Sequence, residues 1–273
     1  MTLNSIVKCG SVLLVLVLRT WIPSLTEAQS PRPNLEGMWS DPPATPVDSF
    51  CSWACTDAGI DRLNALLDDP ANDARPFEQL QAEAKTYERE YIRSKLTAAA
   101  LKTYPLDPAD DPGFLRCEPW GLARQMFAPH QIEIRKRGND RIELRYGEWD
   151  ARRTVYLDGR TRPANQAPSA MGYSVGRWDG DTLVVETSGI AANIAAWPDF
   201  AALNKHSDQL RVVERYTRSK DGGTLLLTAT MEDPWSLREP VVIKKIWRWA
   251  PDQKITPYKD CERPTEFKRG VKP

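Results

Sequence analysis

The sequence lacks most of the features that mark common enzyme and nucleic-acid-binding classes. Only two of its 273 residues are histidine, which leaves little for a catalytic metal site. It has no glycine-rich nucleotide-binding loop and no Gly-x-Ser-x-Gly motif of the kind that positions a nucleophilic serine. Its 37 basic residues are balanced by 37 acidic ones, and the one basic cluster is residues 135–137. Phosphate binding needs a clustered positive face, so nucleic acid is not an expected partner.

Long apolar runs are also scarce. The first 28 residues combine the positive Lys8, the short apolar run Ser11–Leu18 and a small-x-small site ending at Ala28, the pattern of a signal peptide. The apolar run is far shorter than the roughly 20 residues that span a bilayer, so cleavage is favoured over retention as a membrane anchor. We therefore expect a mature chain that begins near Gln29 and is periplasmic or secreted.

Cysteine is sparse, and four cysteines follow the predicted leader. An even number in an exported chain favours disulfides, and four cysteines allow three pairings. We favour a local Cys51–Cys55 bridge and a long-range Cys117–Cys261 bridge that ties the C-terminal region to the start of the β-rich region. Zinc bound by Cys51 and Cys55 is the alternative, although a second ligand pair at the usual spacing is missing.

Two regions follow the leader. Residues 29–105 are predicted to form a proline-rich lead-in and a helical appendage, with helices over 57–67 and 77–104. The lead-in contains Gly37-x-Trp39, a motif that opens the first strand of lipocalin-like barrels but is short enough to occur by chance. Residues 106–273 are predicted to form the β domain.

The β domain is indicated by alternating apolar and polar residues between turn signals. Its clearest example is residues 172–189, where Asp179-Gly180 separates two β-prone runs and supplies the positive φ angles of a tight hairpin turn. Eight strands joined mostly by short turns predict an antiparallel up-and-down barrel of lipocalin-like form, with a two-sheet β-sandwich as the alternative. The expected strands lie near 132–134, 142–146, 155–157, 172–178, 181–189, 210–216, 224–232 and 241–249.

Strand alternation also selects candidate interior polar residues. Glu214 lies on the apolar face of its strand, and Arg177 shares a face with Tyr173. Buried charges must be paired, so Glu214 and Arg177 are candidate partners, with the phenols of Tyr146 and Tyr173 nearby. The pair is either an internal ion pair or a general base with a substrate anchor at the barrel mouth.

The two histidines are the remaining candidates. His206 is expected in a polar loop that leads into the Glu214 strand, where it acts as an acid or base near neutral pH or simply bonds Ser207 or Asp208. These three adjacent residues do not form a catalytic triad, because neighbours in the chain cannot face one another in triad geometry. His130 is interpreted as structural.

Several short motifs and one longer segment between Cys117 and Cys261 resemble an uncharacterised family of exported bacterial β-rich proteins. The segment Gly172–Thr187 is the most specific of them. One departure is Arg162-Pro163, where the family pattern has His-Pro, so any role of that histidine is missing here. The resemblance implies no assigned reaction. Its motifs are Cys117-x-Pro119-x-Gly121 with Arg124, Asp158-Gly159-Arg160, Gly172–Thr187, His206-Ser207, Glu214-Arg215-Tyr216 and Asp233-Pro234.

Two functional classes remain open from the sequence. The first is an exported, cofactor-independent enzyme, a lyase, isomerase or hydrolase, that acts on a small and largely apolar molecule by proton transfer. Its predicted acid and base are His206 and Glu214, and Arg177, Tyr173 and Tyr146 orient the substrate. The alternative is a non-catalytic protein that binds a small apolar ligand. Neither class calls for a metal or a cofactor.

Overall fold

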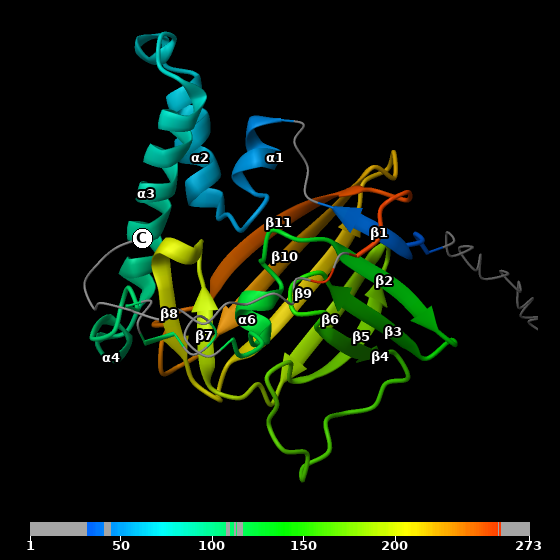
Figure 1. The fold of residues 1–273 in the computed structure, drawn as a ribbon. Coiled ribbons are helices and arrows are strands. Elements are labelled where there is room, and N and C mark those ends of the chain that lie inside the picture. The colour runs from blue at the N-terminus through cyan, green and yellow to red at the C-terminus, as the bar shows by residue number, and fades with distance from the viewer. Residues whose placement is uncertain are drawn as a thin grey trace, which may run out of the picture. The chain divides into compact units, whose positions relative to one another are not determined.

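The computed structural model of this chain describes residues 32–40, 45–107, 110–111, 113, 117–255 and 257. The centre of the compact unit formed by residues 32–273 is a closed β-barrel, with a group of helices beside it (Figure 1). Closure confirms the predicted barrel over the sandwich. In order around the barrel the strands are β1 (Gly37–Ser40), β11 (Val241–Trp249), β10 (Thr224–Glu232), β9 (Arg211–Arg218), β6 (Thr182–Ser188), β5 (Tyr173–Asp179), β4 (Arg152–Tyr156), β3 (Arg141–Tyr146) and β2 (Ile132–Arg137).

The barrel differs from the prediction in strand number and in one strand direction. It has nine strands, because the short lead-in motif at Gly37-x-Trp39 forms β1 and pairs with both β2 and β11. It is not wholly antiparallel, because β4 and β5 run parallel through Val155 and Tyr156. Parallel neighbours need a crossover of about a dozen residues or more, and segment 157–172 provides it where the sequence suggested a turn.

Alternation along the strands sends one set of side chains into the barrel. On β10 the buried residues are every second one from Leu225 to Met231, and β11 repeats this pattern from Val241 to Trp247. Trp39, in the chain's first strand, is fully buried and packs edge-on against Trp249 with ring centroids 5.0 Å apart. The barrel interior is therefore a packed core of side chains.

The helical appendage is α1 (Pro46–Phe50), α2 (Asp57–Leu67) and α3 (Phe77–Lys95), followed by the short α4 (Ala98–Leu101). Thr56 caps α2, accepting a 3.1 Å hydrogen bond from the Gly59 amide. The long predicted helix ends at Lys95, nine residues before the expected Tyr104. It ends there because the backbone of Leu96 is extended and pairs with Leu237. Tyr87 on α3 lies on the solvent side of the helix, 48% exposed.

A second, two-stranded sheet was not predicted. It pairs β7 (Asn193–Ala196) with β8 (Leu203–His206), joined through the short helix η3 (Phe200–Ala202). The sequence suggests a polar loop here because the strands are only four residues long and carry no extended alternation. His206 therefore occupies the last position of a strand.

The disulfide predictions are partly tested. Cys51 and Cys55 are bonded, with Cα atoms 4.9 Å apart, which replaces the zinc alternative for that pair. Cys117 is also disulfide-bonded, but its predicted partner Cys261 lies outside the described residues. A disulfide is typical of chains that fold outside the reducing cytoplasm.

The predicted signal peptide, residues 1–28, also lies outside the described part of the chain. Within the described ranges, none of the helices has the length and apolar character needed to cross a bilayer.

Candidate functional site

The barrel interior holds a buried ion pair where the sequence predicted an inward carboxylate. Glu214 on β9 is fully buried, which confirms its predicted orientation. Its partner is Arg153 on β4, whose side chain is 2% exposed. The guanidinium donates from Nη1 to Glu214 Oε2 over 2.5 Å and from Nη2 to Oε1 over 2.8 Å. This two-pronged contact is the strongest geometry for an arginine–carboxylate pair.

Two phenols and two hydroxyls complete the surroundings of this pair. Arg153 Nη2 also donates to the Tyr146 hydroxyl over 2.8 Å, and the Tyr216 hydroxyl donates to Glu214 Oε1 over 2.8 Å. Ser174 and Thr187 lie 2.9 Å apart, and both hydroxyls accept from Arg153 Nη1 over longer distances, 3.5 and 3.3 Å. The carboxylate is therefore held by donors on both oxygens, as a buried charge requires.

The pKa shifts in this network favour a charged guanidinium between neutral phenols. Burial raises the pKa of Tyr146 and raises that of Tyr216 well above its ordinary value. Burial, the largest single influence, lowers the pKa of Arg153, but the charge of Glu214 together with Tyr146, Tyr216 and the hydrogen bond to Glu214 raises it, so the net shift is upward. Neither the phenols nor the guanidinium change charge near neutral pH, which is the behaviour of a structural network.

The predicted partner Arg177 is not in the network, and neither is Tyr173. The side chain of Arg177 is 62% exposed and lies 3.9 Å from Glu186 on the outer surface. Tyr173 stacks on Tyr156 at 5.2 Å, also away from the interior. The other face of β5 points inward, because a side chain at Gly176 would come within 2.7 Å of Val155.

Sequence reasoning missed Arg153, although a signal for it was present. Val155 is an apolar residue of the third expected strand, and the alternation rule places residue 153 on the same face. β4 confirms this, since Arg153 and Val155 are its buried positions. The ion pair could therefore have been assigned by applying to this strand the rule that placed Glu214.

His206 lies in a different place, at the end of β8. It is 2% exposed, and Nδ1 lies 2.9 Å from the Ser207 carbonyl oxygen, so Nδ1 carries the proton and donates it. Nε2 is buried and has no hydrogen-bond partner among the described residues. Burial lowers the pKa of His206 below its ordinary value, which favours the neutral imidazole with a free lone pair on Nε2. His206 and Glu214, predicted to act together, thus belong to separate groups of residues.

Two motifs that are far apart in the sequence meet beside His206. Ser207 donates from its amide and hydroxyl to the two oxygens of the buried Asp233, over 2.8 and 2.6 Å. Ser236 donates to the same carboxylate over 2.8 Å. Asp233 therefore fixes the chain that carries His206 against the turn after β10.

A cavity of about 470 Å³ adjoins this histidine. Trp235, which is 38% exposed, supplies a large aromatic surface, and Ile194 adds an aliphatic one. Its described lining residues are Asp110, Ala192, Asn193, Ile194, Lys205, His206, Ser207 and Trp235. A volume of a few hundred Å³ with a mostly apolar wall and few polar groups suits a small organic molecule.

A second buried charged cluster lies beside the short helix α6 (Leu122–Gln125). Arg124 pairs with Asp111 over 2.6 Å and lies over the ring of Trp120 at 4.0 Å. Burial lowers the pKa of Arg124, and Asp111 opposes that shift. Nearby, Gln125 donates to the Glu148 carbonyl oxygen over 3.0 Å, and the carboxylate of Glu148 pairs with His130, which fits the structural interpretation of that histidine.

Comparison with known proteins adds little to these observations. No known family model matches the chain, and no curated protein does either. Among solved structures, a crystal structure of a mutant of the fluorescent protein UnaG is similar at 17% identity and a TM-score of 0.27, over 44% of this chain and 70% of that one. Similarity at this TM-score supports no conclusion about fold or function.

Proposed function

We propose that this chain is a binding protein for a small, largely apolar molecule, held in the cavity that His206 lines. The observation that carries the proposal is the buried Nε2 of His206, which has no partner in the described part of the chain. A buried polar atom without a partner costs about 1–3 kcal/mol. A turn of the imidazole toward the cavity would let a ligand hydroxyl or amine donate to Nε2 and remove that cost, while Trp235 and Ile194 cover the apolar part of the ligand.

The barrel interior is less suited to a ligand. Both oxygens of Glu214 are already bound, and the inward side chains of β9, β10 and β11 are almost fully buried. We therefore place the ligand of the expected binding protein in the cavity beside β7 and β8, not inside the barrel.

Mass spectrometry of co-purifying small molecules tests the proposal. We expect an organic extract of the native protein to contain one enriched apolar species in near-equimolar amount. His206→Phe, which removes the acceptor and fills space, should lose this species, whereas the surface change Arg177→Met should keep it. Absence of an enriched species, or its full retention by His206→Phe, would contradict the proposal.

Proton-transfer catalysis is the second candidate, and the state of His206 favours it. A neutral imidazole with a free lone pair is able to act as a general base, and the lowered pKa keeps it neutral. The predicted second group, Glu214, is held in its ion pair, so the base in this candidate is His206 alone. If the wild-type protein converts the extracted species and the His206→Gln variant does not, the protein is a lyase, isomerase or hydrolase.

We also infer that the protein is periplasmic or secreted after removal of residues 1–28, as expected for a member of the exported family that its motifs resemble. The Cys51–Cys55 disulfide supports an oxidising compartment. Mass analysis of the N-terminus of the protein recovered from a periplasmic fraction tests this directly. A protein found in the cytoplasm with residues 1–28 intact would contradict export.

A further inference from the structure

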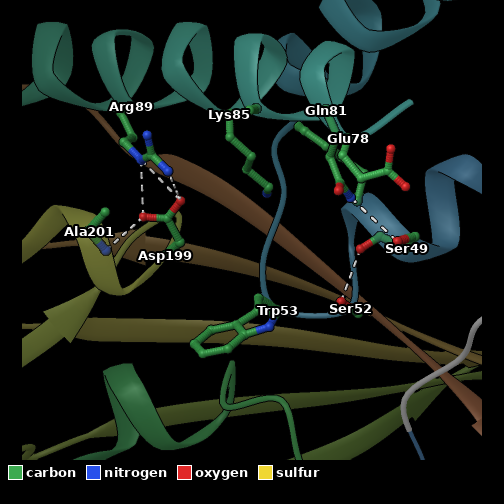
Figure 2. A pocket seen from close by; sticks show the side chains of 11 residues that line it. Ser49, Ser52, Trp53, Glu78, Gln81, Lys85, Arg89, Asp199 and Ala201 are labelled. Atoms are coloured by element: carbon green, nitrogen blue, oxygen red, sulfur yellow. Dashed lines mark hydrogen bonds and ion pairs between the residues drawn. The ribbon is translucent and has the colours of Figure 1, made fainter. Parts of the chain in front are cut away.

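A second cavity lies away from His206, between the helical appendage and the segment that leads into β8. Its volume is about 470 Å³, and its walls come from α1, the following loop, α3 and η3. In Figure 2 the ring of Trp53 lies across from the side chains of α3, with the Arg89–Asp199 pair on one side and Gln81 with Ser49 on the other. The ligand proposed for the His206 cavity does not occupy this one.

The floor of the cavity is an aromatic ring with an accessible surface. Trp53 is 37% exposed, although most large apolar side chains of this protein are buried. The backbone holds it in place, since residue 53 lies between Cys51 and Cys55 of the disulfide. An accessible indole on a restrained backbone offers the negatively polarised face of its ring to a ligand at small entropic cost.

The walls of the cavity are polar, and their charges are mostly balanced. Arg89 on α3 donates to both carboxylate oxygens of Asp199, over 2.8 to 3.2 Å, so its planar group is fixed in orientation. Lys85 Nζ is bonded to the Ala54 carbonyl oxygen over 2.5 Å and to Glu88 over 2.7 Å. Glu78 adds one further carboxylate to the wall, and the other charges are paired, so the wall offers no site for a strong anion.

Uncharged hydrogen-bonding groups lie beside these charges. Gln81 Nε2 lies 3.4 Å from the Ser49 hydroxyl, a long bond that leaves the amide oxygen available. Ser52 donates to the Ser49 carbonyl oxygen over 3.0 Å and lines the cavity as well. The cavity thus combines one ring with several donors and acceptors of planar or hydroxyl type.

From this combination we propose that the cavity binds a neutral saccharide, with one sugar ring stacked on Trp53. The C–H groups on a face of a pyranose are weakly positive and suit the indole face, while its hydroxyls are both donors and acceptors. Gln81, Ser49 and the fixed Arg89–Asp199 pair bond those hydroxyls. This ligand chemistry differs from the apolar ligand proposed for the His206 cavity, and the two sites are independent.

Saturation-transfer NMR with the full chain tests the proposal. The probes are cellobiose, maltose, lactose and chitobiose, each at about 10 mM, which covers the millimolar affinities expected of a single stacked ring. We expect saturation transfer to the ring protons of at least one disaccharide. Absence of transfer to all four would overturn the proposal.

Three variants locate the binding. Trp53→Ala and Gln81→Ala should each weaken the bound disaccharide by tenfold or more, and Trp53→Tyr, which keeps a ring, should retain most of the binding. The matched control is Trp235→Ala, because Trp235 is exposed to nearly the same degree, 38% against 37%, but lines the other cavity. Unchanged binding in Trp53→Ala, or an equal loss in Trp235→Ala, would overturn the assignment. The apolar species extracted from native protein should be the same in Trp53→Ala, which separates this test from that of the His206 cavity.

Discussion

At the scale of single residues, the dominant feature is a charge pair buried in an apolar barrel. Removing either charge from water is costly, and the mutual attraction of Arg153 and Glu214 offsets that cost only while both are present. The hydroxyls of Tyr146, Tyr216 and Thr187 add hydrogen bonds that satisfy the rest of the pair. This dependence on both partners gives the first prediction.

Glu214→Gln and Arg153→Met are each expected to lower the free energy of unfolding by about 3–5 kcal/mol, because each leaves one buried charge without its partner. The double variant should recover part of that loss. Chemical denaturation of the three variants and wild type measures the coupling. Arg177→Met is the control, and should change stability by less than about 0.5 kcal/mol because its side chain is 62% exposed. A double variant that loses the sum of the two single losses would contradict a coupled pair.

The second prediction concerns His206 and pH. Its pKa is lowered in the folded state from the ordinary value of 6.5, mainly by burial, so the unfolded chain binds the proton more readily. Acid therefore favours unfolding, and stability should fall as pH drops below about 6.5 toward the folded-state pKa. We expect His206→Gln to show a smaller loss of stability between about pH 6.5 and pH 5.

Denaturant titrations at several pH values measure this slope for both proteins. Above about pH 7.5 the histidine is neutral in both states, so the two stability curves should run parallel there. Equal slopes for wild type and His206→Gln below about pH 6.5 would show that the burial of this ring is not linked to protonation.

The sequence allowed part of the candidate site to be predicted at this scale. Alternation placed Glu214 inward, and Tyr146 is in the same network. The choice of face on β5 failed because Tyr173 and Val175 give the outer face an apolar half, while the inner face offers Ser174, Gly176 and Trp178 and is not clearly more apolar. The approach of Gly176 to Val155 shows which face is inside. That approach is a tertiary contact that local patterning does not contain.

At the scale of elements, the β5–β6 hairpin tests the turn chemistry. The predicted turn pair is shifted by one residue: Asp179 still pairs with Thr182, so Gly180 and Asp181 form the turn, and only Gly180 has positive φ, +57°. A Cβ added at Gly180 would have no atom within 4 Å, so a side chain there has a conformational cost without a clash. Gly180→Val should lower stability by about 1–2 kcal/mol, because β-branched residues resist positive φ. Gly180→Asn is the matched control, since Asn tolerates this conformation and should lose much less. If both variants melt at the same temperature as wild type, the turn assignment is wrong.

Elements with long alternating patterns were predictable, and short ones were not. The β9, β10 and β11 strands are eight or nine residues long with alternating burial, and all three were identified. β1, β7 and β8 have four residues each, too few for a period to be recognised. The parallel β4–β5 pairing depends on the path of segment 157–172, and the sequence has no local mark of strand direction.

At the scale of the whole molecule, the segment that carries the disulfide joins the helical appendage to the barrel through backbone hydrogen bonds. The Cys55 amide and carbonyl pair with Lys244 on β11 over 2.9 and 2.7 Å, and Cys51, Cys55 and Ile246 belong to the apolar cluster beneath α2 and α3. The helices therefore cover the barrel wall at β11, and the disulfide lies in that contact. Loss of this bridge should loosen the helices before it loosens the barrel.

We expect the double change Cys51→Ser with Cys55→Ser to lower stability by about 2 kcal/mol, the chain-entropy value for a short loop. Hydrogen exchange should accelerate in α2 and α3 more than in β9 and β10. Treatment of wild type with a reductant is the companion measurement and should give the same pattern. Equal acceleration in helices and barrel would contradict a local role of the disulfide.

The internal network has a consequence for how the barrel closes. The parallel contact between β4 and β5 has only two residue pairs, yet Arg153 on β4 reaches Ser174 on β5, Thr187 on β6 and Glu214 on β9. A partly opened barrel would admit water at this junction and separate a charge from its partner. A one-residue slip of β9 would place Val213 or Arg215 where Glu214 belongs. The ion pair thus penalises half-closed and misaligned barrels alike, so that correct strand register and complete closure are reached together.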